Sequence, residues 1–131
     1  MQNQGTEKKT VVHGRPFDLS QRLLEFAVGN VKLTARLART AAGRYIAGQL
    51  MRASASCGAN YQEARGAESR ADFIHKLQLV LKEIREAGYW LQLADKADVL
   101  QGSDMESLRK EADELTRIIV KSVLTAKSKC R

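Results

Sequence analysis

Proline is almost absent from this chain of 131 residues. The only one, Pro16, lies near the N-terminus, so no proline beyond it interrupts helical hydrogen bonding. No strand or hairpin pattern, such as regular alternation of apolar and polar residues, competes with the helical periodicity. These absences exclude a β-rich fold. They predict an all-α protein whose long helices form a single domain.

Long apolar runs are also absent. No window approaches the length of a membrane span, and the first residues, M-Q-N-Q-G-T-E-K-K, contain no apolar signal region. The sequence therefore predicts neither a transmembrane helix nor an exported protein. Cys57 and Cys130 are the only cysteines and lie far apart. We expect no disulfide, a reduced Cys57 used for packing, and a cytoplasmic location.

The residue patterns of catalytic and metal sites are missing. His13 and His75 are the only histidines, and neither has a second ligand at metal-binding spacing. Glu83 and Glu86 could face one site, but the metal sites of helical bundles use Glu-x-x-His on two helices. No P-loop, nucleophile elbow or dinucleotide-binding loop occurs. We expect no enzymatic activity, no catalytic residue, no cofactor and no metal.

Breaks in the hydrophobic periodicity divide the chain into parts. Residues 1–15 are predicted to be flexible, residues 16–127 to form the folded domain, and residues 128–131 to form a basic tail. Helices are expected from a cap at Asp18 or Ser20 to residue 39, and over 44–65, 70–98 and 103–127. Because the connections are short, neighbouring helices should run antiparallel in an up-down-up-down four-helix bundle.

The expected boundaries and core positions follow from capping chemistry and helical spacing. The boundary residues are Thr40 or Gly43, Gly66 as a left-handed stop, Ser69 with Asp72 as a weak capping box, Gly102 as a break, and Ser103 with Glu106 as a better box. The core positions are Leu19, Leu23, Phe26, Leu33 and Leu37, with Leu24, Ala27 and Val31 alongside; Ile46, Leu50, Ala53, Cys57 and Ala64; and Leu108, Ala112, Leu115, Ile119, Ser122 and Ala126.

Small residues fill positions 53–59 of the second helix, which read A-S-A-S-C-G-A. Small side chains let neighbouring helices approach closely. One interpretation is tight packing inside a single bundle. The other is contact on both sides of the helix, with its own bundle and with another subunit, and the sequence leaves both open.

The third helix carries two parallel seams of residues. One seam is apolar throughout and should face the core: Phe73, Leu77, Val80, Ile84, Ala87, Leu91 and Ala94. The other, which we call the mixed seam, combines charges with leucines and the only tryptophan: Asp72, Lys76, Leu79, Glu83, Glu86, Trp90 and Leu93. We interpret the mixed seam as a subunit interface. The alternative is that its charges form i,i+4 pairs while Trp90 covers the core.

The net charge of +7 favours acidic partners, nucleic acid above all. In the predicted topology, Arg36, Arg39, Arg44 and Lys96 meet an equal number of acids at one end of the bundle. The opposite end, which we call the basic end, holds the predicted nucleic-acid-binding residues: Arg15, Arg22, Arg65, Arg70, Lys121, Lys127, Lys129 and Arg131. We expect contacts to the phosphate backbone with little sequence selectivity, and no aromatic platform there. The alternative is a solubilising, frayed terminus.

Four segments carry a family resemblance: Q-L-M-R-A-S-A-S (49–56), A-N-Y-Q-E-A (59–64), D-F-I-H-K (72–76) and L-K-E-I-R-E-A-G-Y-W-L (81–91). With Ala53 in place of a usual serine, they resemble the four-helix-bundle proteins related to those encoded in 23S rRNA intervening sequences. The resemblance implies an antiparallel four-helix bundle and a homopentameric ring, as known for relatives. It also implies kinship with accessory proteins of diversity-generating retroelements, which partner reverse transcriptase and nucleic acid. It carries over no catalytic residue.

Two functions follow as hypotheses. The first is an oligomeric basic bundle that binds RNA or DNA. The second is an adaptor whose partner is another protein, such as a reverse transcriptase, with the positive charge only steering association.

Overall fold

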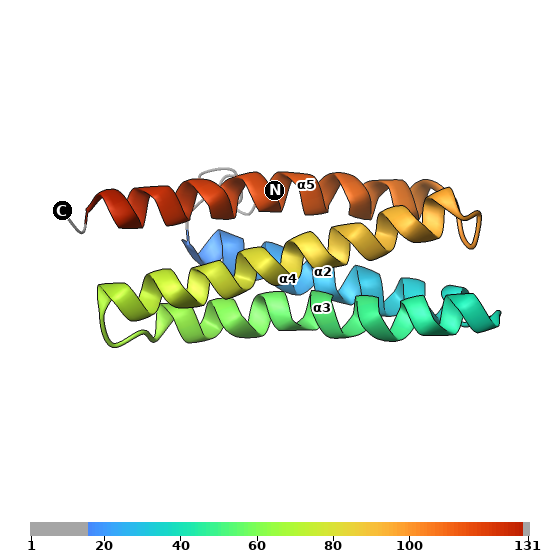
Figure 1. Cartoon of the computed structure of the whole chain (residues 1–131), viewed down its shortest axis with the longest axis horizontal. Coiled ribbons are helices and arrows are strands. Elements are labelled where there is room, and N and C mark those ends of the chain that lie inside the picture. Colours follow the sequence, from blue (N-terminus) through green and yellow to red (C-terminus); the bar gives the residue numbers. More distant parts are fainter. Residues whose placement is uncertain (1–15, 130–131) are drawn as a thin grey trace, which may run out of the picture.

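The computed structural model describes residues 16–129, and within them the chain forms four helices and no strand. The helices are α2 (Pro16–Leu37), α3 (Ala41–Arg65), α4 (Arg70–Lys96) and α5 (Ser103–Ser128). They lie side by side and alternate in direction (Figure 1). The predicted all-α four-helix bundle is confirmed. The predictions for residues 1–15 and 130–131, including Arg15 and Arg131, fall outside the described residues.

The corner between α2 and α3 depends on two residues. The Thr40 hydroxyl caps α3 by accepting a hydrogen bond from the Gly43 backbone nitrogen at 2.9 Å. A Cβ atom added at Gly43 would lie 1.8 Å from the Leu37 carbonyl oxygen, so only glycine fits there without a shift of the backbone. The predicted caps at Asp18 and Ser20 are wrong, because α2 already begins at Pro16, a position that suits the fixed φ of proline.

The two remaining connections differ in detail from the sequence expectation. Gly66 ends α3, but its φ of −97° is not left-handed. Ser69 caps α4 as predicted, accepting from the Asp72 nitrogen at 3.0 Å. The α4 helix ends earlier than expected because Asp98 adopts a φ of 58°, and the Val99 nitrogen bonds back to the Ala94 carbonyl at 2.9 Å.

The fourth helix lacks the predicted capping box. Gly102 occupies the cap position with a φ of 137°, and no side chain caps the helix. The helix starts instead with the Glu106 nitrogen donating to the Gly102 carbonyl at 3.1 Å. Ser103 is therefore already the first helical residue. A φ of this sign and size favours glycine over any other residue at this position.

The core confirms the apolar seam of α4 in all but one position. Leu77, Val80, Ile84, Ala87, Leu91 and Ala94 are fully buried, whereas Phe73 at the start of the helix is only partly buried. On α5, Met105 and Val123 are buried, while the expected Leu108 and Ser122 are only partly covered. A straight helix has 3.6 residues per turn, so positions that repeat every seven residues drift gradually around the helix. The buried positions of α5 therefore depart from a strict heptad pattern.

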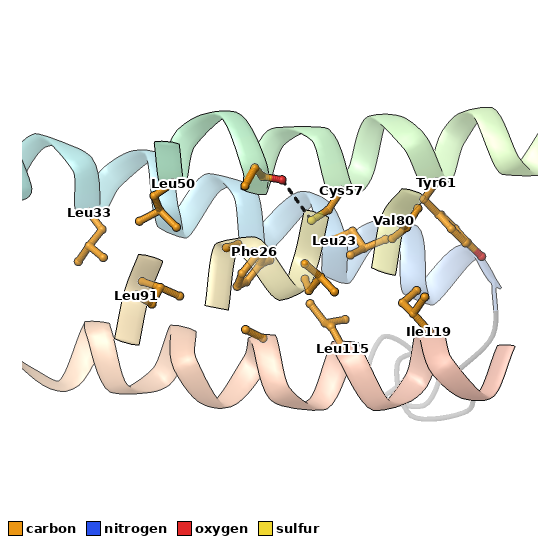
Figure 2. Close-up of a cluster of buried hydrophobic side chains, with 14 of the residues drawn as sticks. Leu23, Phe26, Leu33, Leu50, Cys57, Tyr61, Val80, Leu91, Leu115 and Ile119 are labelled. Atoms are coloured by element: carbon orange, nitrogen blue, oxygen red, sulfur yellow. Dashed lines mark hydrogen bonds between the residues drawn. The ribbon is translucent and has the colours of Figure 1, made fainter. Parts of the chain in front are cut away.

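Cys57 packs inside the core, as predicted (Figure 2). Its Sγ atom donates a hydrogen bond to the Ala53 carbonyl oxygen at 3.3 Å. Burial raises the pKa of the Cys57 thiol to about 12. The thiolate is the reactive form of cysteine, so Cys57 is a packing residue that resists modification in the folded protein.

Two buried polar side chains, Asn30 and Thr34, interrupt the core of α2, and only Asn30 has no solvent exposure. Asn30 is fully buried, and its Nδ2 atom donates to the Phe26 carbonyl oxygen at 2.9 Å. Its Oδ1 atom has no hydrogen-bond partner within the described residues. Asn30 fills the gap between Phe26 and Leu33 in the predicted apolar series, and that gap was the sequence signal for it. Such an orphaned acceptor lowers the stability of a core.

Candidate nucleic-acid interface

A groove lies at the basic end, between the first turns of α4 and the C-terminal half of α5. It has a volume of about 580 Å³. Figure 1 shows why it forms, since α4 approaches α5 at the α4–α5 connection and diverges from it toward the N-terminus of α4. We call this the basic groove. Its lining residues are Arg70, Phe73, Ile118, Lys121, Ser122, Thr125, Ala126 and Lys129.

The basic groove carries uncompensated positive charge. Arg70, Lys121 and Lys129 are exposed and line it, and no acidic residue does. None of the three forms an ion pair with any other residue of the described chain. Lys127, on the last turn of α5, is also exposed and outside these ion pairs. The groove is therefore a site where an anion meets cations without competition from carboxylates.

An aromatic ring and an aliphatic side chain form the floor of the groove. Phe73 and Ile118 are partly buried and pack against the hydrophobic core. The sequence analysis expected no aromatic platform at the basic end, but the structure shows that Phe73 lines the basic groove. Phe73 heads the core seam of α4, but the helix has diverged from α5 at this point. Its side chain therefore borders the groove and is only partly covered.

Arg22 and Arg65 are engaged elsewhere. The Arg22 guanidinium donates to both carboxylate oxygens of Glu111, at 2.8 and 3.0 Å, and also lies 3.5 Å from Glu114. The hydrogen bond to Glu111 raises the pKa of Arg22, and the pair neutralises its charge. Arg65 donates to the Ser20 hydroxyl at 3.1 Å and forms no ion pair within the described chain. Of the eight predicted residues, the structure gathers Arg70, Lys121 and Lys129 around one groove.

The mixed seam of α4 lies half-buried along its whole length. Three of its charged residues, Lys76, Glu83 and Glu86, form their ion pairs with residues of α3. Lys76 forms an ion pair with Glu63 at 2.9 Å, and Arg52 bridges Glu83, at 3.4 Å, and Glu86. These contacts hold α3 against α4 within one chain. A role of the mixed seam in a subunit interface stays a prediction. It concerns Asp72, Lys76, Leu79, Glu83, Glu86, Trp90 and Leu93.

Trp90 connects the seam to an exposed aromatic cluster. Its Nε1 atom donates to Glu86 at 3.1 Å. Its ring meets Tyr45 and Tyr89 edge to face, with centroid separations of 5.8 and 5.1 Å. Both tyrosines are largely exposed. Because Trp90 is the only tryptophan, its fluorescence reports on this cluster alone.

Acid should change the fluorescence of Trp90. The hydrogen bonds from Trp90 and then from Arg52 lower the pKa of Glu86 below its ordinary value of 4.5. Glu86 therefore stabilises the fold above about pH 4.5, and this contribution is lost as the pH falls through the lower folded-state pKa. We expect a step in emission in that range, measured by acid titration. In Glu86→Gln, which keeps an acceptor for Trp90, this step should disappear; equal steps in both proteins would contradict the assignment.

A second apolar surface lies on the outside of α2 and α3. Leu24, Val28 and Val31 are exposed, Leu24 to 56%. Leu24 lines a hollow together with Ala55 and Ala59, the outward residues of the small-residue segment, whereas Ala53, Ser54 and Cys57 of that segment are buried. Sequence reasoning placed Leu24 and Val31 beside the core. Leu24, Val28 and Val31 are spaced four and three residues apart. This spacing was the sequence signal for an apolar stripe on the outer face of α2, which we call the outer stripe.

No group of three or more His, Cys, Asp and Glu side chains in residues 16–129 is arranged to hold a metal ion. None of the four described helices has an apolar stretch that would cross a bilayer.

Comparisons with known proteins agree with the bundle. A model of the 23S rRNA-intervening sequence protein family matches residues 15–121. A crystal structure of a protein of unknown function from Bacteroides thetaiotaomicron, of the S23 ribosomal protein family, superposes with a TM-score of 0.75 at 34% sequence identity. The superposition covers 80% of this chain and 97% of that one. No curated protein matches the sequence.

Proposed function

This chain belongs to the family of 23S rRNA-intervening sequence proteins, and from that premise we propose that it is a non-enzymatic, oligomeric nucleic-acid-binding protein of the cytoplasm. The observation that carries the proposal is the basic groove. Arg70, Lys121 and Lys129 surround it without a carboxylate in its lining. Nucleic acid is the abundant cellular polyanion that such a surface suits.

Binding through these side chains would be driven by the phosphate backbone. Lysine and exposed arginine at a helix end neutralise phosphates and release counterions, which provides affinity but does not read the base sequence. The two hydroxyl groups in the lining, Ser122 and Thr125, are too few to recognise a defined sequence. The proposed protein therefore binds many sequences with similar affinity.

We propose a homopentamer as the oligomeric state. It is supported by the outer apolar stripe of Leu24, Val28 and Val31, which a neighbouring subunit would cover, and by the exposed Tyr45 and Tyr89 beside the mixed seam. A ring of five chains would place several basic grooves on one assembly, so one nucleic-acid strand contacts more than one of them. Light scattering tests this directly, because a pentamer has five times the mass of one chain.

The nucleic-acid proposal predicts a steep dependence of affinity on salt. If the three cations of one groove each neutralise a phosphate, the slope of log K against log salt is about −2 for one engaged groove on a single strand. Raising salt from about 50 to about 200 mM then weakens binding roughly twentyfold. Fluorescence anisotropy with labelled RNA and DNA measures it.

A shortened chain provides the control for that titration. Ending the chain after Ala126 removes Lys127, Lys129 and Arg131 while most of α5 remains. The shortened protein should show a flatter salt slope and the same oligomeric mass. Absence of detectable binding at low salt by the full chain would refute the nucleic-acid proposal.

The alternative is an adaptor that binds another protein, such as the reverse transcriptase of a retroelement. The observation that favours it is the same outer stripe on α2, since Leu24, Val28 and Val31 expose an apolar surface of the kind that proteins bury on association. A chain that stays monomeric and binds no nucleic acid at low salt would make the adaptor the better account.

A further inference from the structure

We propose that the basic groove binds an unpaired nucleotide, with phosphates on Arg70, Lys121 and Lys129 and the base on Phe73. This inference rests on the proposed function and makes it more specific. It predicts that the protein prefers single-stranded nucleic acid to duplex. The reason is the combination of one aromatic ring with three cations in one groove.

The floor of the groove is the first part of the argument. A base is flat and apolar on its faces, and it gains affinity by stacking on an aromatic side chain. Phe73 is partly exposed in the groove while the rest of its ring rests on the core, so it is held in place. In a duplex both faces of each base are stacked on neighbours, so no base face is free to stack on Phe73. A duplex would leave Phe73 and Ile118 uncovered.

The positions of the cations are the second part. Arg70 lies one turn before Phe73 on α4, and Lys121 and Lys129 stand along the facing side of α5. The cations therefore flank the ring from both helices. A strand that places one base on Phe73 brings its adjacent phosphates toward both walls. Cations on a single helix could not contact phosphates on both sides of the base, because they would line only one wall of the groove.

The size and polarity of the groove fit a nucleotide. A volume of about 580 Å³ lies in the range of sites for small organic ligands. The Ser122 hydroxyl donates to the Ile118 carbonyl at 3.1 Å, which leaves its oxygen free to accept a hydrogen bond from a base.

The test compares single strands with duplexes of the same sequence, about 16 nucleotides long, as RNA and as DNA. Wild type should bind the single strands more tightly. Phe73→Leu keeps the apolar volume, removes the aromatic face, and should lower single-strand affinity about tenfold without changing duplex affinity. The matched control is His75→Leu on the same helix, which removes an exposed ring outside the basic groove and the mixed seam and should change neither affinity.

The outcomes separate this inference from the proposed function. Equal loss for both forms in Phe73→Leu, or duplex binding as tight as single-strand binding, would overturn the stacking role and leave phosphate binding intact. Absence of binding by every form would overturn both. A difference between RNA and DNA arms would identify the strand that the groove prefers, and either preference supports the inference.

A second variant reports on the ring directly. Phe73→Trp in a Trp90→Phe background places the only tryptophan of the chain in the groove. Stacking of a base should quench its emission when a single strand is added, and duplex should quench it much less. Unquenched emission under conditions where anisotropy shows single-strand binding would place the bound base elsewhere and reject the inference.

Discussion

Asn30→Asp is expected to destabilise the protein by about 3–5 kcal/mol, the largest effect we expect of any single substitution. The side chain is fully buried and has no cationic neighbour among its hydrogen-bond partners. An ionised carboxylate there would lose its hydration and keep no compensating charge. Urea unfolding followed by circular dichroism, at a fixed protein concentration because the chain is proposed to associate, measures the change.

The pH dependence of that variant checks the cause. Burial raises the folded-state pKa of an unpaired carboxyl above its unfolded value, so the penalty is present at neutral pH and shrinks as the pH falls. The difference from wild type should thus be smaller at about pH 5 than at about pH 7. A difference that does not change with pH would mean that shape, and not charge, is responsible.

Asn30→Leu is the matched control for Asn30→Asp. It keeps the branched shape and removes the Oδ1 acceptor that has no partner. Removing an orphaned acceptor should stabilise the protein by about 1 kcal/mol. If Asn30→Asp lowers the free energy of unfolding and Asn30→Leu raises it, then a charge at this buried position destabilises the protein and a polar side chain there adds no stability.

Reversing the charge of the basic groove is expected to abolish nucleic-acid binding. Arg70→Glu, Lys121→Glu and Lys129→Glu together replace the three cations of the proposed phosphate site by three repelling carboxylates. We expect a loss on the order of a hundredfold or more at low salt. The three side chains are exposed and outside the core, so circular dichroism should show unchanged helix content.

The control for charge reversal uses the opposite end of the bundle. Arg39, Arg44 and Lys96 are exposed and form no ion pair in the described chain. Changing all three to Glu alters the net charge by the same amount, so it measures long-range steering alone. A much smaller loss of affinity is expected. Equal losses in both triple variants would show that net charge, and not the groove, is what nucleic acid senses.

The fold was predictable because its determinants are local. Thr40 and Ser69 are capping residues that act on nitrogens three positions away, and the apolar seam from Leu77 to Ala94 repeats along one helix. Such patterns need no knowledge of distant segments. The ends that failed, at Asp98 and Ser103, are decided by a left-handed aspartate and an unusual glycine. An aspartate only occasionally adopts that conformation, so the presence of Asp98 in the sequence did not predict that α4 ends before it.

The candidate site was only partly predictable because it depends on distances between helices. The sequence placed Arg22 among the phosphate-binding residues, but its partner Glu111 comes from the other end of the chain. Phe73 was assigned to the core because its spacing fits the seam, and only the divergence of α4 from α5 leaves it beside the groove. The topology did bring Arg70, Lys121 and Lys129 to one end of the bundle, since antiparallel helices place the start of α4 beside the end of α5; their role in binding nucleic acid stays a prediction.

The pair between Arg22 and Glu111 also bears on how the chain reaches this structure. It joins residues 89 positions apart, in α2 and α5, the helices of the bundle that contact each other least among the neighbouring pairs. The other neighbours are joined by short connections and assemble through contacts close in sequence, which form fast. Closing the bundle between α2 and α5 carries the largest loop-closure entropy and returns the fewest contacts. We therefore expect the contact between α2 and α5 to be the last to form during folding, after α3 and α4 have already paired.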